Sequence, residues 1–403
     1  MQPTLFHASE HAINFSEIDR DALAVVQRLR SAGYTAYLVG GCVRDFLTKR
    51  RPKDYDISTS ARPEEIKKIF GRQCLIIGRR FRLAHIRFGQ KIIEVSTFRT
   101  GDSADSDLIT QDNEWGTPEE DVLRRDFTIN GLFYDPEQHA VIDFVGGWKD
   151  IHTGTLRTIG APEVRFKQDP VRMIRLLKFR ARFGFEIDPT TRKALIRCRE
   201  EIIKSSPARV LEEMLRMLES TAASPFYRLM REAALLELLF PELADTLGHE
   251  VGTSIYRLLS ASDHLHKHEK PLDRASLACS LVYPLFEKEV LAQPNPHMGD
   301  ILMIAGATVR RYIMEAFSHF PRRISSTMIH ILAGQFRITP PPGKKATAQR
   351  SLHTKEFDLV LQFFKIRAVA DSSLQDTYHH WQDQMSRLEQ REPAAPRSRR
   401  RRR

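Results

Sequence analysis

Hydrophobic and polar positions repeat with different periods in the two parts of this chain. Between about residues 36 and 159, short runs of β-branched and aromatic residues alternate with turns, which predicts a mixed α/β domain built on a small sheet. A helix should precede this sheet, capped by Ser16 and closed by Gly33. The predicted strands span residues 35–39, 55–59, 74–78, 83–88, 91–98, 129–134 and 140–144.

Beyond residue 161 the apolar positions recur every three or four residues, as in amphipathic helices that pack on one another. The chain is also too long for one hydrophobic core. We therefore expect an α/β head followed by an all-helical neck, body and tail. The predicted boundaries are 16–160 for the head, 161–245 for the neck, 246–390 for the body and 391–403 for a disordered, arginine-rich end.

The 403 residues carry a formal net charge of +11, which favours a polyanionic partner. Much of the excess lies in the arginines at the C-terminal end, and the rest of the chain is only mildly basic. Such an arm typically binds nucleic acid without sequence preference, although a merely solubilising end would have the same composition. The arginines of this end that we predict to bind RNA are Arg397, Arg399, Arg400 and Arg401.

The four cysteines show no CxxC spacing, which argues against structural zinc and against a disulfide framework. No apolar run reaches the length of a membrane span, and the first residues lack a basic stretch followed by an apolar one. We therefore expect a cytoplasmic protein that does not insert into a membrane.

The segment from residue 37 to residue 58 holds the strongest candidate site. Gly40 and Gly41 can turn the chain sharply and bring backbone N–H groups close to an anion. Asp54 and Asp56 are two residues apart, so on a strand their carboxylates would face the same side and suit Mg²⁺. A phosphate cradle beside such a pair favours phosphoryl or nucleotidyl transfer. A tight turn followed by two solvated aspartates is the alternative.

The order of these residues resembles one known family. LVGGCVRD, which ends in Arg44 and Asp45, followed by PKDYDIST, is similar to the head of the nucleotidyltransferase branch that contains bacterial poly(A) polymerases and CCA-adding enzymes. The resemblance implies transfer of a nucleotide to an RNA 3′ end by a two-metal mechanism, with ATP as substrate, pyrophosphate as leaving group and Mg²⁺, or alternatively Mn²⁺, as cofactor. It also implies that the glycine turn and the Arg-Asp pair bind the nucleotide.

A third acid, Glu94, lies among apolar positions of a predicted strand. A buried acid is costly unless it is paired or bound to a metal. In the resembled family this position supplies a third carboxylate on a strand next to the first two, so Asp54, Asp56 and Glu94 would hold the metal ions and, with Asp126, form the catalytic set. A glutamate that faces water on an edge strand is the alternative.

RRDFTIN resembles the family segment that recognises the ribose of the incoming nucleotide. Arg125 can pair with phosphate, Asp126 can accept hydrogen bonds from sugar hydroxyls, and Asn130 can do either. We therefore predict that these three residues bind the nucleotide.

QDPVRMIR is predicted to open a helix on which Asp169 and Arg172 lie one turn apart on one face. The resemblance implies that this pair reads the base edge of the nucleotide, whereas the spacing alone would also fit an ordinary ion pair. The family usually has a glutamate where this chain has Gln168. Arg209, in the next matching segment, is a further candidate for nucleotide binding.

The pattern GRRFRLAH precedes the third acid. Arg79, Arg80, Arg82 and His85 surround an aromatic residue, a combination that suits an RNA backbone and a stacked base. In the resembled family this pattern is typical of bacterial poly(A) polymerases. We therefore favour a template-independent polynucleotide adenylyltransferase, acting in RNA polyadenylation and decay, over a CCA-adding or A-adding tRNA nucleotidyltransferase.

Two other functions have weaker support. A family member that only binds RNA would need a broken carboxylate set. His264 and His268 are one turn apart, as in some metal-dependent hydrolases, but no matching distal ligands follow. The acidic segment 100–121 lacks the glycine and distal glutamate of an EF-hand loop, so we predict a mobile loop near the active site rather than a metal site.

Overall fold

In the computed structural model, the described residues are 2–78, 82–100, 114–269, 271–317, 320–341, 343–344, 346–347 and 354–391. Arg79, Arg80, most of the acidic segment 100–121 and the C-terminal arginines lie outside them. Contacts divide the chain into two units, residues 1–204 and 205–403. Each unit is described by itself.

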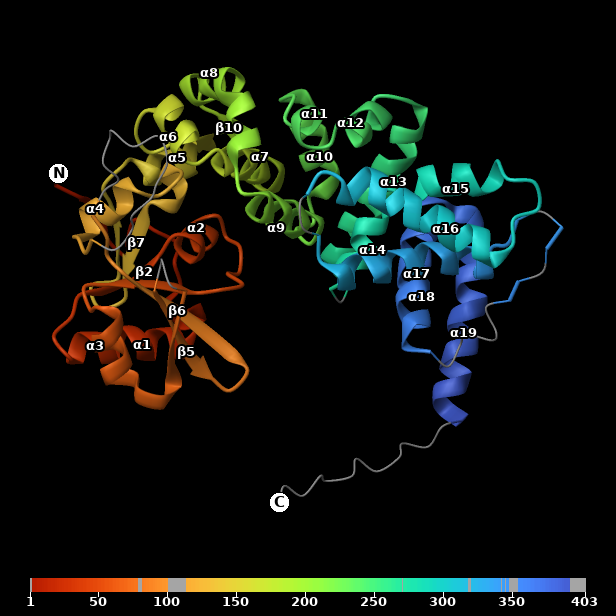
Figure 1. The fold of residues 1–403 in the computed structure, drawn as a ribbon. Coiled ribbons are helices and arrows are strands. Elements are labelled where there is room, and N and C mark those ends of the chain that lie inside the picture. Colours follow the sequence, from red (N-terminus) through yellow and green to blue (C-terminus); the bar gives the residue numbers. More distant parts are fainter. Residues whose placement is uncertain are drawn as a thin grey trace. The chain divides into compact units, whose positions relative to one another are not determined.

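The alternating segments of the first unit pair into a sheet of eight strands (Figure 1). The order across the sheet is β1-β8-β7-β2-β3-β6-β5-β4. Each predicted strand has a counterpart, but the one predicted at 129–134 begins only at Leu132, after a helical turn at Thr128–Asn130. Strand β1 at one edge is an addition that the sequence pattern did not predict. The strands are β1 (Thr4–Phe6), β2 (Ala36–Val39), β3 (Asp56–Thr59), β4 (Cys74–Ile77), β5 (Leu83–Phe88), β6 (Lys91–Thr97), β7 (Leu132–Asp135) and β8 (Ala140–Asp143).

The sheet is mixed, because β3 and β6 run parallel while the other neighbours are antiparallel. The register places Asp56 opposite Glu94, so the expectation that the acid-bearing strands are neighbours is confirmed. The expected strand position of Asp54 is wrong. Strand β3 begins at Asp56, and Asp54 lies in the loop before it.

Helices α1 (Arg20–Ser31) and α3 (Pro63–Phe70) lie side by side next to strands β5 and β6 in Figure 1, and both contact the sheet. The predicted cap at Ser16 is wrong, because α1 begins later. Asp19 caps it instead, and its carboxylate accepts hydrogen bonds from the N–H groups of Asp21 and Ala22 at 3.0 and 3.1 Å.

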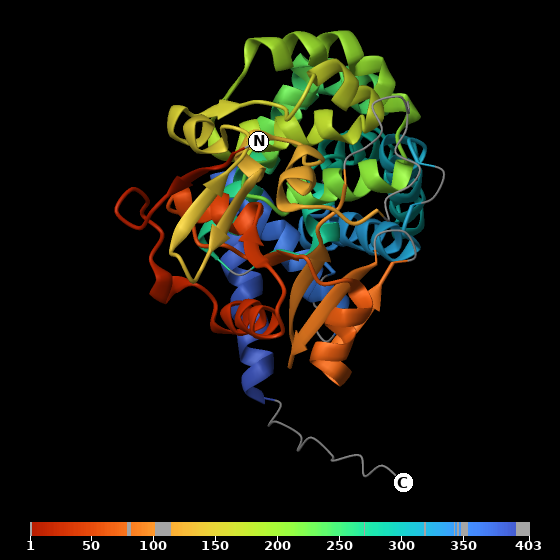
Figure 2. The same ribbon diagram turned by 90° about the vertical axis from the view of Figure 1, so that its left-hand side faces the viewer.

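The helices between residues 147 and 198, which come after the last strand of the eight-stranded sheet, gather at one end of that sheet (Figures 1 and 2). They appear in yellow and yellow-green in Figures 1 and 2. A two-stranded sheet, β9 (Thr155–Leu156) with β10 (Glu186–Ile187), joins them. The remaining helices of this unit are α2 (Gly41–Leu47), α4 (Pro118–Leu123), α5 (Gly147–Thr153), α6 (Pro162–Gln168), α7 (Val171–Phe183) and α8 (Pro189–Cys198).

The described part of the second unit is helical, as the period of its apolar positions predicted. None of the described helices is long and apolar enough to span a membrane. The helices are α9 (Pro207–Leu218), α10 (Ala223–Glu232), α11 (Leu236–Leu239), α12 (Pro241–Leu247), α13 (Glu250–His268), α14 (Arg274–Cys279), α15 (Tyr283–Leu291), α16 (Met298–Val309), α17 (Arg322–Ile338), α18 (Lys355–Ala370) and α19 (Gln375–Arg391).

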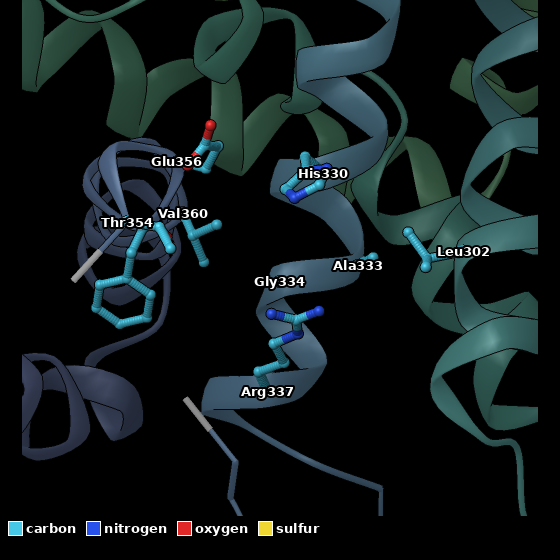
Figure 3. A pocket seen from close by; sticks show the side chains of 9 residues that line it. Leu302, His330, Ala333, Gly334, Arg337, Thr354, Glu356 and Val360 are labelled. Atoms are coloured by element: carbon cyan, nitrogen blue, oxygen red, sulfur yellow. The ribbon is translucent and has the colours of Figure 1, made fainter. Parts of the chain in front are cut away.

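A pocket of about 280 Å³ lies between α16, α17 and α18 of the second unit (Figure 3). Apolar groups and a few charged side chains share its wall. It is lined by Leu302, His330, Ala333, Gly334, Arg337, Thr354, Glu356, Phe357 and Val360.

Candidate active site

The chain turns sharply between β2 and α2. Gly40 has a φ of 70° and a ψ of −118°, a conformation that favours glycine. A Cβ atom at this position would also lie 3.1 Å from the Nη1 atom of Arg125. Glycine therefore lets the backbone approach that guanidinium closely, and the first residue of α2 is Gly41.

Arg44 is buried and ties this turn to the rest of the site. Its Nη1 donates to the Oδ1 of Asn130 at 2.5 Å, and its Nε and Nη2 donate to the Oδ1 of Asp45 at 2.9 and 2.7 Å. The guanidinium also lies over the rings of Phe179 and Phe183. Helix α2, the segment around Asn130 and helix α7 are thereby held together.

A pocket of about 410 Å³ opens beside the glycine turn. This volume is within the range of small-molecule and cofactor sites. Basic side chains outnumber carboxylates along its wall, and burial together with the nearby charges of Arg44 and Arg50 lowers the pKa of Arg182. This excess of positive charge suits a triphosphate. The pocket is lined by Gly40, Gly41, Arg44, Asp56, Arg124, Arg125, Asp126, Asn130, Asp169, Arg172, Arg175, Lys178, Phe179 and Arg182.

Of the three predicted metal ligands, Asp54, Asp56 and Glu94, Asp56 is the one that lines this pocket. Its side chain is exposed in the pocket, yet the surrounding protein still limits its solvation. Poor solvation, with the nearby charges of Glu94 and Asp54, raises the pKa of Asp56 to about 6, although Arg125 and Arg44 oppose the rise. A cation would relieve this repulsion.

The predicted metal ligands Asp54, Asp56 and Glu94 offer carboxylate oxygens from the adjacent strands β3 and β6 and from the loop before β3. Carboxylate oxygens are the ligands that Mg²⁺ prefers. Among the described residues, however, no three Asp, Glu, His or Cys side chains converge closely enough to hold a metal ion by themselves. The Glu94 Oε2 atom instead lies 3.4 Å from the Nε2 of His85. Protein carboxylates and phosphate oxygens of a bound nucleotide together would complete the coordination.

The segment from Arg125 to Asn130 forms part of the pocket wall. The Nη2 of Arg125 donates to the Oδ2 of Asp121 at 2.9 Å and to the Oγ of Ser58 at 3.2 Å. Asp126 is buried, and its Oδ1 accepts from the Phe127 N–H at 2.8 Å and from the Asn130 amide at 2.9 Å. These contacts hold the segment rigidly.

Asp126 also pairs with helix α7, since its Oδ2 lies 2.7 Å from the Nη2 of Arg175. Burial alone would raise the pKa of Asp126, but Arg175, the Asn130 amide and the Phe127 N–H together lower it below the ordinary value. Asp126 is therefore ionised and engaged with the protein, so that it fixes the positions of Asn130 and Arg175.

The predicted helical pair of Asp169 and Arg172 is wrong in its secondary structure. Helix α6 ends at Gln168 with Asp169 as its C-cap, and α7 begins at Val171, after Pro170. The residue before a proline is disfavoured in the α conformation, and Asp169 has a φ of −146° and a ψ of 88°. Both residues nevertheless line the pocket, and the Arg172 N–H donates to the Asp169 carbonyl at 3.1 Å.

Gln168, which replaces the usual glutamate of the resembled family, is buried next to Arg165. The Nη1 of Arg165 donates to the Gln168 Oε1 at 3.0 Å, and its Nη2 donates to the carbonyls of Arg124 and Arg125 at 2.7 and 3.0 Å. Gln168 therefore positions an arginine that holds the backbone of the pocket wall.

Replacing Gln168 with leucine should lower the free energy of unfolding by about 1–3 kcal/mol, because one acceptor of the buried Arg165 guanidinium is lost. Gln168→Glu keeps an acceptor of the same length and serves as the control. Urea unfolding of the two variants measures the difference. Equal stability of the leucine variant and the wild type would contradict this role.

Sequence reasoning missed the basic stripe on α7. Arg175, Lys178 and Arg182 line the pocket together with Arg172. Their spacing of three to four residues places them on one face of the helix, and that spacing is a signal that the sequence carries.

The remaining predicted residues are placed as follows. Arg82 pairs with Glu64 at the start of β5, and His85 lies on β5 beside Glu94. Arg209 lies in the second unit, in the first turn of α9. The rings of His264 and His268 are 4.7 Å apart on α13, and they belong to no group of metal ligands within the described residues.

Two known protein families match this chain, and together they cover most of its first unit. The family described as "Poly A polymerase head domain" matches residues 36–157. The one described as "Probable RNA and SrmB-binding site of polymerase A" matches residues 184–247.

Curated relatives extend the similarity over nearly the whole chain. Poly(A) polymerase I of Escherichia coli O6:H1 is 35% identical over 363 residues, which is 86% of this chain and 78% of the relative. Poly(A) polymerase I of Haemophilus influenzae is 35% identical, and the alignment covers 96% of this chain and 89% of the relative. The CCA-adding enzyme of Lactobacillus delbrueckii subsp. bulgaricus is 36% identical over 51% of this chain and 52% of its own.

Solved structures confirm the predicted fold class. The Bacillus stearothermophilus CCA-adding enzyme in complex with CTP has a TM-score of 0.68 and 25% identity, covering 94% of this chain and 89% of that one. The Thermotoga maritima CCA-adding enzyme complexed with tRNA shares the fold at a TM-score of 0.57 and 17% identity, covering 99% and 92%. With relatives that are 35% identical over most of its length, this chain belongs to the bacterial poly(A) polymerase and tRNA nucleotidyltransferase family.

Proposed function

We propose that this chain is a template-independent polynucleotide adenylyltransferase that adds AMP from ATP to RNA 3′ ends and releases pyrophosphate. The observation that carries the reaction class is the pocket in which the Gly40 turn, a basic wall and the Asp56 carboxylate meet. The choice of adenylate is supported by the poly(A) polymerase I relatives, which match most of this chain, whereas the CCA-adding relative matches about half of it.

The proposed metal ligands are Asp54, Asp56 and Glu94. They would hold two Mg²⁺ ions, or alternatively Mn²⁺, together with oxygens of the triphosphate. When bound, the ions neutralise charge on the phosphates and increase the acidity of the RNA 3′-hydroxyl. The raised pKa of Asp56 supports a cation-binding role, because burial and neighbouring carboxylates disfavour its ionised form in the absence of a cation.

The chain's own residues bind and orient the nucleotide. The Gly40 N–H donates to the Leu132 carbonyl at 3.1 Å, so the glycine turn would approach the phosphates through its backbone at Gly41, and the basic face of α7 would bind them as well. Arg125 would pair with a phosphate, and Asn130, oriented by Arg44 and Asp126, would contact the ribose. Asp169 and Arg172, which also line the pocket, would meet the base edge.

A transfer assay tests the proposed function. The purified protein is incubated with Mg²⁺ and either an unstructured RNA or a tRNA lacking its CCA end, and each RNA receives ATP or CTP alone. We expect long, heterogeneous tails on both RNAs from ATP and no tails from CTP. A short, tRNA-restricted product that requires CTP would instead identify a CCA-adding enzyme. Omission of the metal is the control and should abolish transfer.

A further inference from the structure

The carboxylates of the candidate site lie on a row of residues that crosses the sheet to its edge. Asp56 on β3 pairs with Glu94 on β6, which pairs with His85 on β5, which pairs with Leu75 on β4. Residues that are direct partners in a sheet face the same side. The row therefore joins the candidate active site to an open face of β4, β5 and β6.

This face is apolar and exposed, whereas the opposite one is buried. Leu75, Ile77 and Ile92 have exposed fractions of 50%, 41% and 48%. On the opposite face, residues such as Ile86 and Ile93 are buried, and helix α3 packs against β4 and β5. Apolar side chains at this density on a solvent-facing sheet beside an active site indicate a binding surface.

Basic residues accompany the apolar ones. Arg87, which is exposed, pairs across the strands with Ile92, and Arg82 lies next to the first residue of β5. Neighbouring strands are about 4.8 Å apart, so the row from Asp56 to Leu75 is about 15 Å long. Sheet surfaces of about this width hold two or three bases by their faces. Apolar side chains can cover base faces while arginines contact the backbone.

We propose that this face, defined by Leu75, Ile77, Leu83, His85 and Ile92, is the platform on which the bases of the RNA 3′-terminal nucleotides rest. The proposal rests on the proposed function and names the surface that presents the 3′ end to the carboxylates. Because apolar contact with a base face does not depend on base identity, the platform would accept RNA ends of any sequence.

The double variant Leu75→Ser/Ile77→Ser tests the platform. It should raise the KM for RNA about tenfold while the KM for ATP changes less than twofold. Since no cation is removed, the dependence of RNA affinity on salt concentration should keep its slope. Leu5→Ser is the matched control, because Leu5 is 41% exposed on β1, at the opposite edge of the same sheet.

An RNA with abasic sites at its last three nucleotides separates base contacts from backbone contacts. The wild type should bind this RNA about tenfold more weakly than the intact one, and the double variant should bind the two RNAs equally. Equal affinity of the wild type for both RNAs would overturn the platform. So would an unchanged KM for RNA in the double variant, or a change from dimer to monomer in light scattering, which would identify the face as a contact between copies.

The two proposals fail separately. A wild type that adds no nucleotide to any RNA would overturn the proposed function. A wild type that adds AMP normally while the double variant retains its KM for RNA would overturn the platform alone. ATP binding by the double variant, measured by calorimetry without RNA, confirms that its site remains folded.

Discussion

Replacing Asp56 with asparagine should lower the rate of AMP transfer by at least about 10³-fold, which corresponds to about 4 kcal/mol of transition-state stabilisation. Asp56 lies in the pocket and is the acid that pairs in register with Glu94. Asparagine keeps the size of the side chain but removes the charge that would attract a divalent cation. Single-turnover transfer of AMP to a labelled RNA measures the effect.

The Asp56→Asn variant should lose AMP transfer but keep its affinity for RNA and its thermal stability. The RNA platform does not include this carboxylate, and the metal-free wild type carries the repulsion between Asp56, Glu94 and Asp54 that the substitution relieves. The variant should therefore bind RNA within twofold of the wild type and melt at the same or a higher temperature in EDTA. The exposed Asp245→Asn in the second unit is the control. Residual activity near the wild-type level would remove the carboxylate from the proposed metal site.

Most strands of the sheet were predictable because each is marked by a pattern within its own short segment of the sequence. Alternation of apolar and polar residues gives the strands, and the acid on each of β3 and β6 marks the face that is open to the site. The position of Asp54 was not predictable from spacing alone, because the first residue of a strand depends on pairing with a neighbour. Here Asp56 is the first residue of β3 that pairs with β2 and β6.

The sequence contains a signal for the break between α6 and α7, namely Pro170. The helical spacing of the surrounding residues nevertheless favoured a single helix that includes Asp169 and Arg172. Pro170 disfavours the α conformation at Asp169, so the helix could not continue through that residue. The contacts that form the pocket wall had no such signal. Arg44 and Asn130 are separated by 86 positions in the chain, and Asp126 and Arg175 belong to different elements. Only tertiary packing decides which of the many arginines meet.

Replacing Gly147 with alanine should destabilise the first unit by about 3 kcal/mol and lower kcat/KM about 10²-fold. A Cβ atom at Gly147 would lie 2.1 Å from the backbone carbonyl oxygen of Thr128. The start of α5 cannot retreat easily, because the Asp143 carboxylate accepts hydrogen bonds from the N–H groups of Gly147 and Trp148 at 3.1 and 2.9 Å. The displaced residue would be Thr128.

The loss of activity follows from the place of Thr128 in the chain. It opens the short helical turn Thr128–Asn130, and Asn130 is the residue that accepts from Arg44 in the pocket wall. Gly306→Ala is the control, because its added Cβ would lie 3.9 Å from the Cδ1 of Ile329, and alanine favours a helix by about 1 kcal/mol. Urea unfolding and transfer kinetics on both variants compare the two sites. If Gly147→Ala unfolded at the wild-type urea concentration, α5 would have room to move, and the pocket wall would not depend on its close approach.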